Sequence, residues 1–97
     1  MLVLITYDVC IVSEGGQKRL RNIAKTCLDY GVRVQNSVFE CEIDPAHFVT
    51  LKSKLMEIFN PEQDSLRFYF LGKKGHQKVE HVGAKRVADP LRDALIL

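Results

Sequence analysis

The segment from Leu2 to Val9 constrains the fold of this chain more than any other. It is apolar on both faces and contains Val, Ile and Tyr, which is typical of a strand in the middle of a sheet. The chain has 97 residues, enough for one domain, 1–97, with a limited core. We therefore expect a single small domain built around this strand, with a core that association with a second copy helps to complete.

The next part of the chain predicts a helix followed by two strands. Apolar residues recur at helical spacing through residues 20–28, which predicts an amphipathic helix. Ser13 is a candidate N-cap for this helix, and Gly31 fits the left-handed position that follows a helix. Residues 32–43 then form two extended segments with a break near Asn36, and the second segment alternates apolar with mostly polar side chains.

A second helix and a fourth strand complete a ferredoxin-like order. Asp44 before Pro45 is typical of a helix start, and an apolar stripe at helical spacing follows as far as Phe59. The alternation from Ser65 to Leu71 predicts a strand. The sequence thus predicts an α+β ferredoxin-like βαββαβ sandwich with both helices on one face of the sheet. Apolar residues left over for the other face predict a homodimer.

Residues 72–97 differ in composition from the rest of the chain. This segment is basic because it contains, among others, Lys73, Lys74, Lys78, Lys85 and Arg86. Residues 77–82 predict an extra C-terminal strand. The apolar end, 90–97, predicts docking on this chain or on a partner.

Composition and motifs exclude several classes of protein. The net charge is only +2, so a nucleic-acid surface must come from local clustering of Lys and Arg. Three cysteines without a C-x-x-C pair argue against a disulfide framework or a zinc site. No stretch approaches the roughly 20 apolar residues of a membrane span, so we expect a cytoplasmic protein without a membrane partner. P-loop, Rossmann and nucleophile-elbow patterns are also absent.

Asp8 is the residue that most suggests chemistry. It follows an apolar strand directly after Tyr7, and a carboxylate in such a place needs a hydrogen bond, a counter-charge or a metal ion. One interpretation is a ligand for Mg²⁺ or Mn²⁺, which prefer oxygen donors. The other, favoured by spacing alone, is an Asx-turn that ends the strand. Two Asp8 side chains brought together by a two-fold axis would make a better metal site than one.

A basic ridge on the first helix suggests contact with phosphates. Lys18, Arg21 and Lys25 share one side of that helix. For a basic helix considered alone, a solvated face is the commoner explanation. Further basic candidates for contact with nucleic acid are Arg19, which lies off that line, Arg33, Lys73, Lys74 and Lys78. The aromatic residues Tyr7, Phe39 and Tyr69 are candidates for stacking on bases, although the alternation pattern makes Phe39 a core residue.

Four segments of the sequence resemble one known family. They are the strand end Ile5-Thr6-Tyr7-Asp8, the basic pair Arg19 and Arg21, the run Gly31-Val32-Arg33-Val34-Gln35-Asn36-Ser37-Val38-Phe39-Glu40, and the strand start Gln63-Asp64-Ser65-Leu66-Arg67-Phe68-Tyr69. In this order they resemble the small CRISPR-associated protein that partners the CRISPR integrase in spacer acquisition. The third segment, similar to that family's G-x-R-x-Q-x-S-V-F-E, is the most specific.

The resemblance implies a fold, an activity and a set of partners. It implies a ferredoxin-like homodimer in which the C-terminal strand extends the partner's sheet, with Mg²⁺ or Mn²⁺ between the two Asp8 side chains. It further implies a metal-dependent endonuclease for double-stranded DNA or RNA, and an adaptor that binds duplex DNA and bridges two dimers of the CRISPR integrase. The residues it links to catalysis are Tyr7, Asp8, Arg19, Arg21, Arg33 and Phe39.

Two other functions fit parts of the pattern. One is a stand-alone ferredoxin-like toxin ribonuclease that acts on RNA, which a neighbouring antitoxin gene would support. A small-molecule regulatory dimer would need an apolar pocket with a few convergent polar groups, and the sequence offers no sign of one. We therefore rank the toxin second and the regulatory dimer last.

Overall fold

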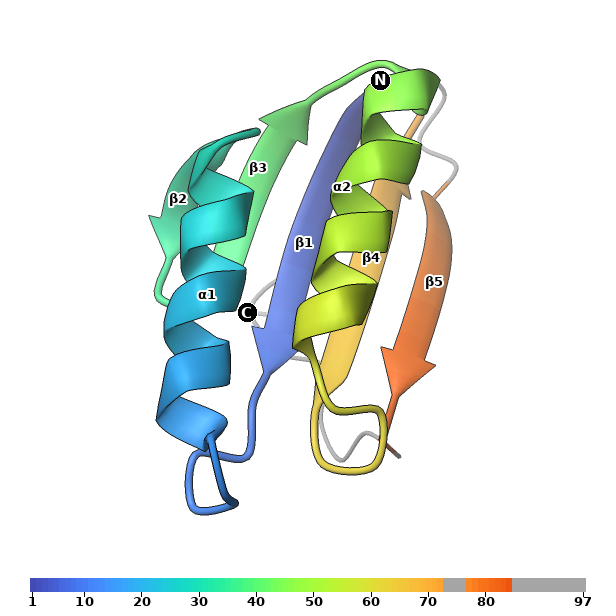
Figure 1. Cartoon of the computed structure of the whole chain (residues 1–97). Coiled ribbons are helices and arrows are strands. Elements are labelled where there is room, and N and C mark those ends of the chain that lie inside the picture. Colours follow the sequence, from blue (N-terminus) through green and yellow to red (C-terminus); the bar gives the residue numbers. More distant parts are fainter. Residues whose placement is uncertain (73–76, 85–97) are drawn as a thin grey trace.

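The computed structural model describes residues 1–72 and 77–84 (Figure 1). Its elements are β1 (Leu2–Asp8), α1 (Gly16–Leu28), β2 (Val32–Gln35), β3 (Val38–Glu42), α2 (Pro45–Ile58), β4 (Ser65–Leu71) and β5 (Gln77–Gly83). The order is the predicted ferredoxin-like βαββαβ arrangement followed by the predicted extra strand, so the fold prediction is confirmed. Lys73, Lys74 and the apolar end of the chain lie outside the described residues.

β1 is the central strand of the sheet, as its two apolar faces predicted. The strand order is β2-β3-β1-β4-β5, and β1 pairs antiparallel with β3 and with β4. β5 pairs antiparallel with β4 of the same chain, from Ser65 opposite Gly83 to Leu71 opposite Gln77. The short connection, 72–76, favours this hairpin pairing. In the single chain the extra strand therefore extends its own sheet, and its docking on a partner, together with the rest of 72–97, stays a prediction.

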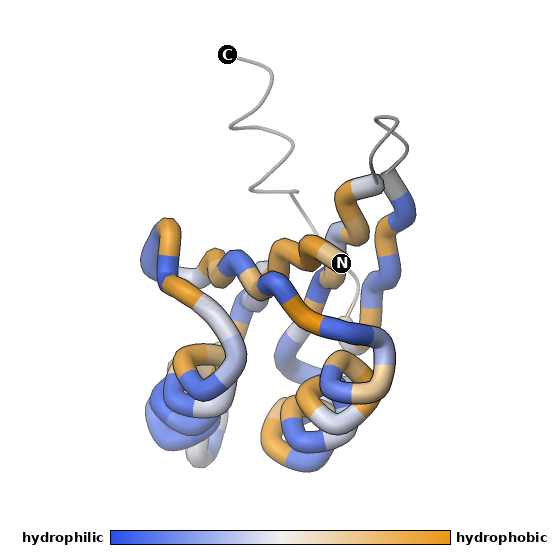
Figure 2. The backbone as a smooth tube through the Cα atoms, turned by 90° about the horizontal axis from the view of Figure 1, so that it is seen from above, coloured by the Kyte–Doolittle hydropathy of each residue, from blue (hydrophilic) through white to orange (hydrophobic). Residues whose placement is uncertain are grey.

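Both helices pack on one face of the sheet and form the core with it (Figure 2). Val3, Ile5 and Tyr7 of β1 point into this layer, opposite buried side chains of β3 and β4. The fully buried large side chains include Ile23, Cys27, Phe39, Leu51, Leu55, Leu66 and Phe68. Burial of each large apolar side chain stabilises the fold by about 1.5–3 kcal/mol, so this layer holds β1 firmly in place.

The two helices begin in different ways. Asp44 caps α2 as predicted, because its side chain accepts a hydrogen bond from the His47 N–H at 2.7 Å and Pro45 follows. The prediction for Ser13 is wrong, since Gly15 with φ +74° is the N-cap of α1. At Gly16, a Cβ would lie 2.2 Å from the Cys10 carbonyl oxygen, so the chain packs too closely there for any other residue.

The reason why glycine is required at position 31 also differs from the one predicted. It does not adopt a left-handed conformation. A Cβ at Gly31 would lie 2.4 Å from the Glu40 carbonyl oxygen and 2.5 Å from Cys41 Sγ. Close packing of the chain against β3, and not the end of α1, therefore requires glycine at this position.

The face of the sheet away from the helices carries a second set of apolar side chains. Leu4, Tyr69 and Val79 lie next to one another across β1, β4 and β5, and 44% of Val79 is exposed. The predicted homodimer rests on this face and stays a prediction for a single chain. Among the described residues, no helix has the length and apolar character needed to cross a membrane.

Candidate active site

Asp8 lies at the end of the sheet where several connections meet. It is the last residue of β1, it is exposed, and it pairs with Ser65, the first residue of β4. The turn between β2 and β3 lies at the same end, because the Tyr7 N–H donates to the Ser37 carbonyl oxygen at 3.2 Å. The start of α1 is there as well (Figure 1). The buried strand β1 thus places the carboxylate of Asp8 in contact with solvent at a fixed position.

The donor set at Asp8 fits a divalent cation only if two chains contribute. A carboxylate oxygen suits Mg²⁺ or Mn²⁺, and Mg²⁺ keeps several waters when one or two carboxylates bind it. Within residues 1–72 and 77–84, no group of three or more His, Cys, Asp and Glu side chains could hold a metal ion. One chain therefore offers the exposed carboxylate of Asp8 here, and the site between two Asp8 side chains stays a prediction.

Tyr7, Phe39 and Arg33 form a stacked group beside β1. The rings of Tyr7 and Phe39 are stacked with centroids 6.0 Å apart, and Arg33 Cζ lies 5.1 Å from the centroid of Phe39. The Tyr7 hydroxyl donates to the Asn36 carbonyl oxygen at 3.2 Å. Burial raises the pKa of Tyr7, partly offset by a hydrogen bond with Arg33.

The three residues of this group differ in their exposure to solvent, and therefore in what they can contact. Tyr7 and Phe39 are 5% and 0% exposed, so neither ring is open to a nucleic-acid base, and any contribution to catalysis would act through packing. Tyr69 is buried too. Arg33 is exposed on the edge strand β2, and its contact with Phe39, a cation–π interaction, holds it near Tyr7. Arg33 is therefore the member of the group that can reach a phosphate.

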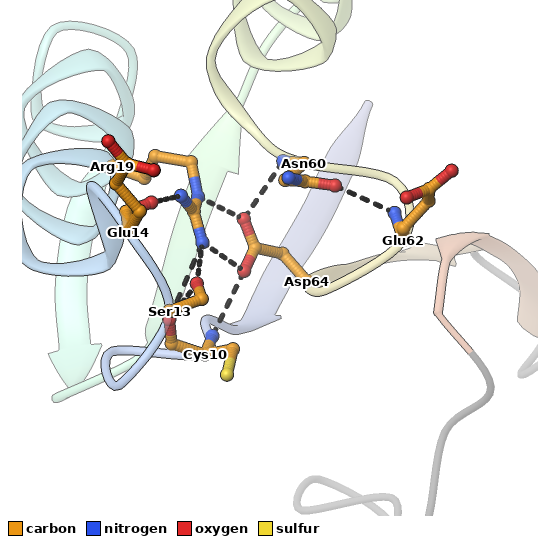
Figure 3. Close-up of polar contacts among 7 residues, drawn as sticks. All are labelled: Cys10, Ser13, Glu14, Arg19, Asn60, Glu62 and Asp64. Carbon is orange, nitrogen blue, oxygen red and sulfur yellow. Dashed lines mark hydrogen bonds and ion pairs between the residues drawn. The ribbon is translucent and has the colours of Figure 1, made fainter.

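Arg19 is engaged in a buried ion pair with Asp64 (Figure 3). Its Nε donates to Asp64 Oδ2 at 2.7 Å and its Nη2 to Asp64 Oδ1 at 3.2 Å. Nη1 donates to the Glu14 carbonyl oxygen, and Nη2 also reaches Ser13 Oγ at 2.6 Å. The Arg19 side chain is only 14% exposed. Within the described residues Arg19 is thus bonded to a buried carboxylate, and its contact with nucleic acid stays a prediction.

Asp64 is the residue that analysis of the sequence did not single out. It is fully buried, and its carboxylate also accepts from the N–H groups of Cys10 and Asn60, each at 2.9 Å. Burial raises the pKa of Asp64, but hydrogen bonds from Arg19, Asn60 and Cys10 outweigh it, so the pKa lies below its ordinary value. The one sequence signal was an aspartate directly before an apolar strand, in the segment that resembles D-S-L-R-x-Y.

Among the residues that the structure describes, the remaining basic candidates do not all converge within one chain. Lys18, Arg21 and Lys25 are exposed on α1, and Arg33 lies on β2 at the same side of the sheet (Figure 1). Lys78 is exposed on β5, the strand at the opposite edge. Lys73 and Lys74 lie outside the described residues. Among the described candidates, those on α1 and β2 are therefore the ones that lie on the same edge of the fold.

Comparison with known proteins decides the family. Residues 1–79 match the model of the CRISPR associated protein Cas2 family. This chain belongs to the Cas2 family. It is 58% identical over its full length to the full length of a CRISPR-associated endoribonuclease Cas2 of Chlorobaculum tepidum. It is 56% identical to a CRISPR-associated endonuclease Cas2 of Halalkalibacterium halodurans, over 99% of each chain.

Solved structures agree with this assignment. The crystal structure of Streptococcus pyogenes Cas2 at pH 6.5 matches with a TM-score of 0.70 and 57% identity, over 75% of this chain and 88% of that one. A hypothetical protein, TT1823 of Thermus thermophilus, shares the fold with a TM-score of 0.57 and 22% identity, over 91% of this chain and 85% of that one. The predicted resemblance, and with it a CRISPR-associated nuclease of the Cas2 type, is confirmed.

Proposed function

We propose that this Cas2 family member acts as a homodimer in which two Asp8 side chains hold one Mg²⁺ or Mn²⁺ ion and support cleavage of a phosphodiester. The observation that carries the proposal is the exposed carboxylate of Asp8 at the end of an otherwise buried central strand. Relatives that share more than half of their residues with this chain are named endoribonuclease or endonuclease. We take double-stranded DNA and single-stranded RNA as the two substrate classes to test.

In this proposal the Asp8 carboxylate and the basic residues have separate tasks in the reaction. A divalent cation at Asp8 supplies Lewis acidity toward a phosphodiester oxygen. Arg33 and the ridge of Lys18, Arg21 and Lys25 hold neighbouring phosphates by charge. An attacking water forms a new phosphorus–oxygen bond and releases a proton to solvent, while the bond to the leaving oxygen breaks and that oxygen takes up a proton. The protein's own contribution is therefore placement of the carboxylate and of the nucleic-acid backbone.

The same dimer also serves as an adaptor. We propose that it binds duplex DNA through the basic ridge and bridges two dimers of the CRISPR integrase, a role that needs no cleavage. Because the contacts are made to phosphates, this binding is independent of sequence and weakens as salt increases. Membership of the Cas2 family favours the CRISPR integrase as the partner over an antitoxin, and therefore argues against a stand-alone toxin ribonuclease.

Cleavage by the wild type and by Asp8→Asn tests the proposal. Both proteins are incubated with duplex DNA and with single-stranded RNA in Mg²⁺, in Mn²⁺ and in EDTA. We expect cleavage only by the wild type with metal. Glu42→Gln, which changes an exposed carboxylate at the other end of the same sheet, is the matched control and retains activity. Cleavage by Asp8→Asn equal to that of the wild type contradicts the proposal.

A further inference from the structure

The ion pair of Arg19 and Asp64 lies where the strands that carry the active site end. Asp64 directly precedes Ser65, the residue paired with Asp8 across β1 and β4. On the other side, the Cys10 N–H, two residues beyond Asp8, donates to Asp64 Oδ1. The carboxylate of Asp64 thus accepts a hydrogen bond from the backbone just after β1, at the point where the pairing of β1 with β4 stops. One side chain fixes both strands next to Asp8.

Asp64 gathers the other connections at this end as well. Its second oxygen accepts from the Asn60 N–H in the connection after α2. Its backbone carbonyl accepts from the Ala84 N–H at 2.8 Å, just after β5. Through Arg19, it is joined to the 9–15 connection by the Ser13 hydroxyl and the Glu14 carbonyl oxygen (Figure 3). Four separate parts of the chain therefore bond to one buried residue, three of them through its carboxylate.

The donors of Arg19 are occupied by these contacts. Nε, Nη1 and Nη2 all donate to protein oxygens, and Asp64 itself is fully buried. A contact between Arg19 and a nucleic-acid phosphate would require these bonds to break and would leave a buried carboxylate without its counter-charge, which is strongly unfavourable. Arg21, two residues further along α1, is exposed instead.

We infer that Arg19 and Asp64 are positioning residues that fix the Asp8 carboxylate by tying the end of β1 to the start of β4, and that Arg19 does not bind nucleic acid. The inference rests on the proposed role of Asp8. It separates two arginines that the resemblance placed together as catalytic residues, and it adds Asp64, to which no role had been given. An error of about 1 Å in the position of a reacting group can reduce the rate about 100-fold, so a loose strand end would show in the turnover.

The test compares the same substitution at the two arginines. Arg19→Lys keeps the charge but loses the planar fork that reaches both Asp64 oxygens and Ser13 together. Arg21→Lys keeps the charge at an exposed position. We expect Arg19→Lys to lower the turnover at saturating nucleic acid about 10-fold or more, with the dissociation constant for duplex DNA and its salt dependence unchanged. Arg21→Lys should act on the dissociation constant, because Arg21 belongs to the proposed binding ridge. Gln17→Ala, at an exposed and uncharged position on the same helix, is the control that should leave the turnover within about twofold of the wild type.

Amide hydrogen exchange provides a readout that does not depend on cleavage. In Arg19→Lys, exchange at the Cys10 and Asn60 amides should be faster, because Asp64 holds both. The His47 amide, which is held by Asp44 at the start of α2, is the internal control and should not change. If Arg19→Lys fails to fold, Ser13→Ala removes one contact with Arg19 and should accelerate Cys10 exchange to a smaller extent.

Two results overturn the inference. One is weaker binding by Arg19→Lys with a smaller salt dependence and an unchanged turnover at saturation, which would make Arg19 a phosphate contact. The other is unchanged exchange at Cys10 and Asn60. If the wild type itself does not cleave, the proposed nuclease fails, but binding and exchange still decide the role of Arg19: unchanged salt dependence with faster exchange supports it, and the reverse contradicts it.

Discussion

The buried end of the sheet around Asp64 and the outer face of α1 use the same residue type in opposite ways. Arg19 is 14% exposed and bonded to a buried carboxylate, whereas Arg21 is exposed to solvent. They are two residues apart on α1, so they point to different sides of the helix. The difference shows that the partner decides the role of a basic residue, and the partner of Arg19 lies 45 positions away in the sequence.

The largest expected effect is loss of Asp64. Asp64→Ala leaves a cavity and removes the acceptor of four hydrogen bonds. Breaking a buried ion pair of this kind costs about 3–5 kcal/mol, which for a chain of this size lowers the melting temperature by roughly 12 °C or more. Thermal unfolding followed by circular dichroism measures it. Glu62→Ala, an exposed acidic residue in the same connection, is the control, and equal melting of both variants would contradict the role of Asp64.

The next largest effect on stability is expected from substitution of Gly83, because this residue packs against Asp64. It has φ +103°, and a Cβ there would lie 2.3 Å from the Asp64 carbonyl oxygen. Gly83→Ala should therefore lower the free energy of unfolding by about 1–3 kcal/mol. Gly15 also has positive φ, but a Cβ there would lie 3.5 Å from Arg19 Nη1, so Gly15→Ala should cost only about 1 kcal/mol. Urea unfolding compares them, and an equal cost at both sites would show that Gly83 is needed for its backbone conformation alone.

A smaller effect is expected in the dependence of stability on pH. Hydrogen bonds to the Asp64 carboxylate lower its pKa in the folded state, while in the unfolded chain it is near 4. The stabilisation is therefore complete above about pH 4 and is lost as the pH falls through the lower folded value. The melting temperature of the wild type should approach that of Asp64→Asn as the pH falls below about 4. A difference between the two proteins that stays constant down to pH 2 would contradict this account.

The smallest effect on stability is expected on the outer face of α1. Arg21→Ala should change the free energy of unfolding by no more than about 0.5 kcal/mol. It should instead weaken duplex binding and reduce the slope of log affinity against log salt by about 1. Fluorescence anisotropy over a range of salt concentrations measures both, with Gln17→Ala, an uncharged exposed residue on the same helix, as the control. Binding unchanged in Arg21→Ala would remove the ridge from the proposed nucleic-acid surface.

Local patterns in the sequence predicted those parts of the molecule that depend on local physics. The alternation of apolar residues identified the strands, and Asp44 with Pro45 identified the start of α2. The position of Asp8 at the end of β1 follows from the same pattern. These features are decided within a few residues of the chain, so they can be predicted without knowing the tertiary contacts.

Long-range contacts decided what the sequence could not show. The roles of Gly16 and Gly31 depend on close approach to Cys10 and to β3, which no local pattern reveals. Arg33 and Lys78 were both candidates for contact with nucleic acid, but Lys78 lies at the opposite edge of the sheet from Arg33. Arg19 could not be distinguished from Arg21 before Asp64 was placed beside it. The role of each of these residues can be assigned only from the tertiary structure.

The most direct test of the account is the activity of mixed dimers of wild-type and Asp8→Asn chains. The chains are mixed in known ratios, unfolded and refolded together, and assayed for Mg²⁺-dependent cleavage. If one ion is held by two Asp8 side chains, an equal mixture retains about one quarter of the activity of the wild type, because only dimers with two aspartates are active. Retention of about one half would show that each chain carries an independent site, and would contradict the shared site at the centre of this proposal.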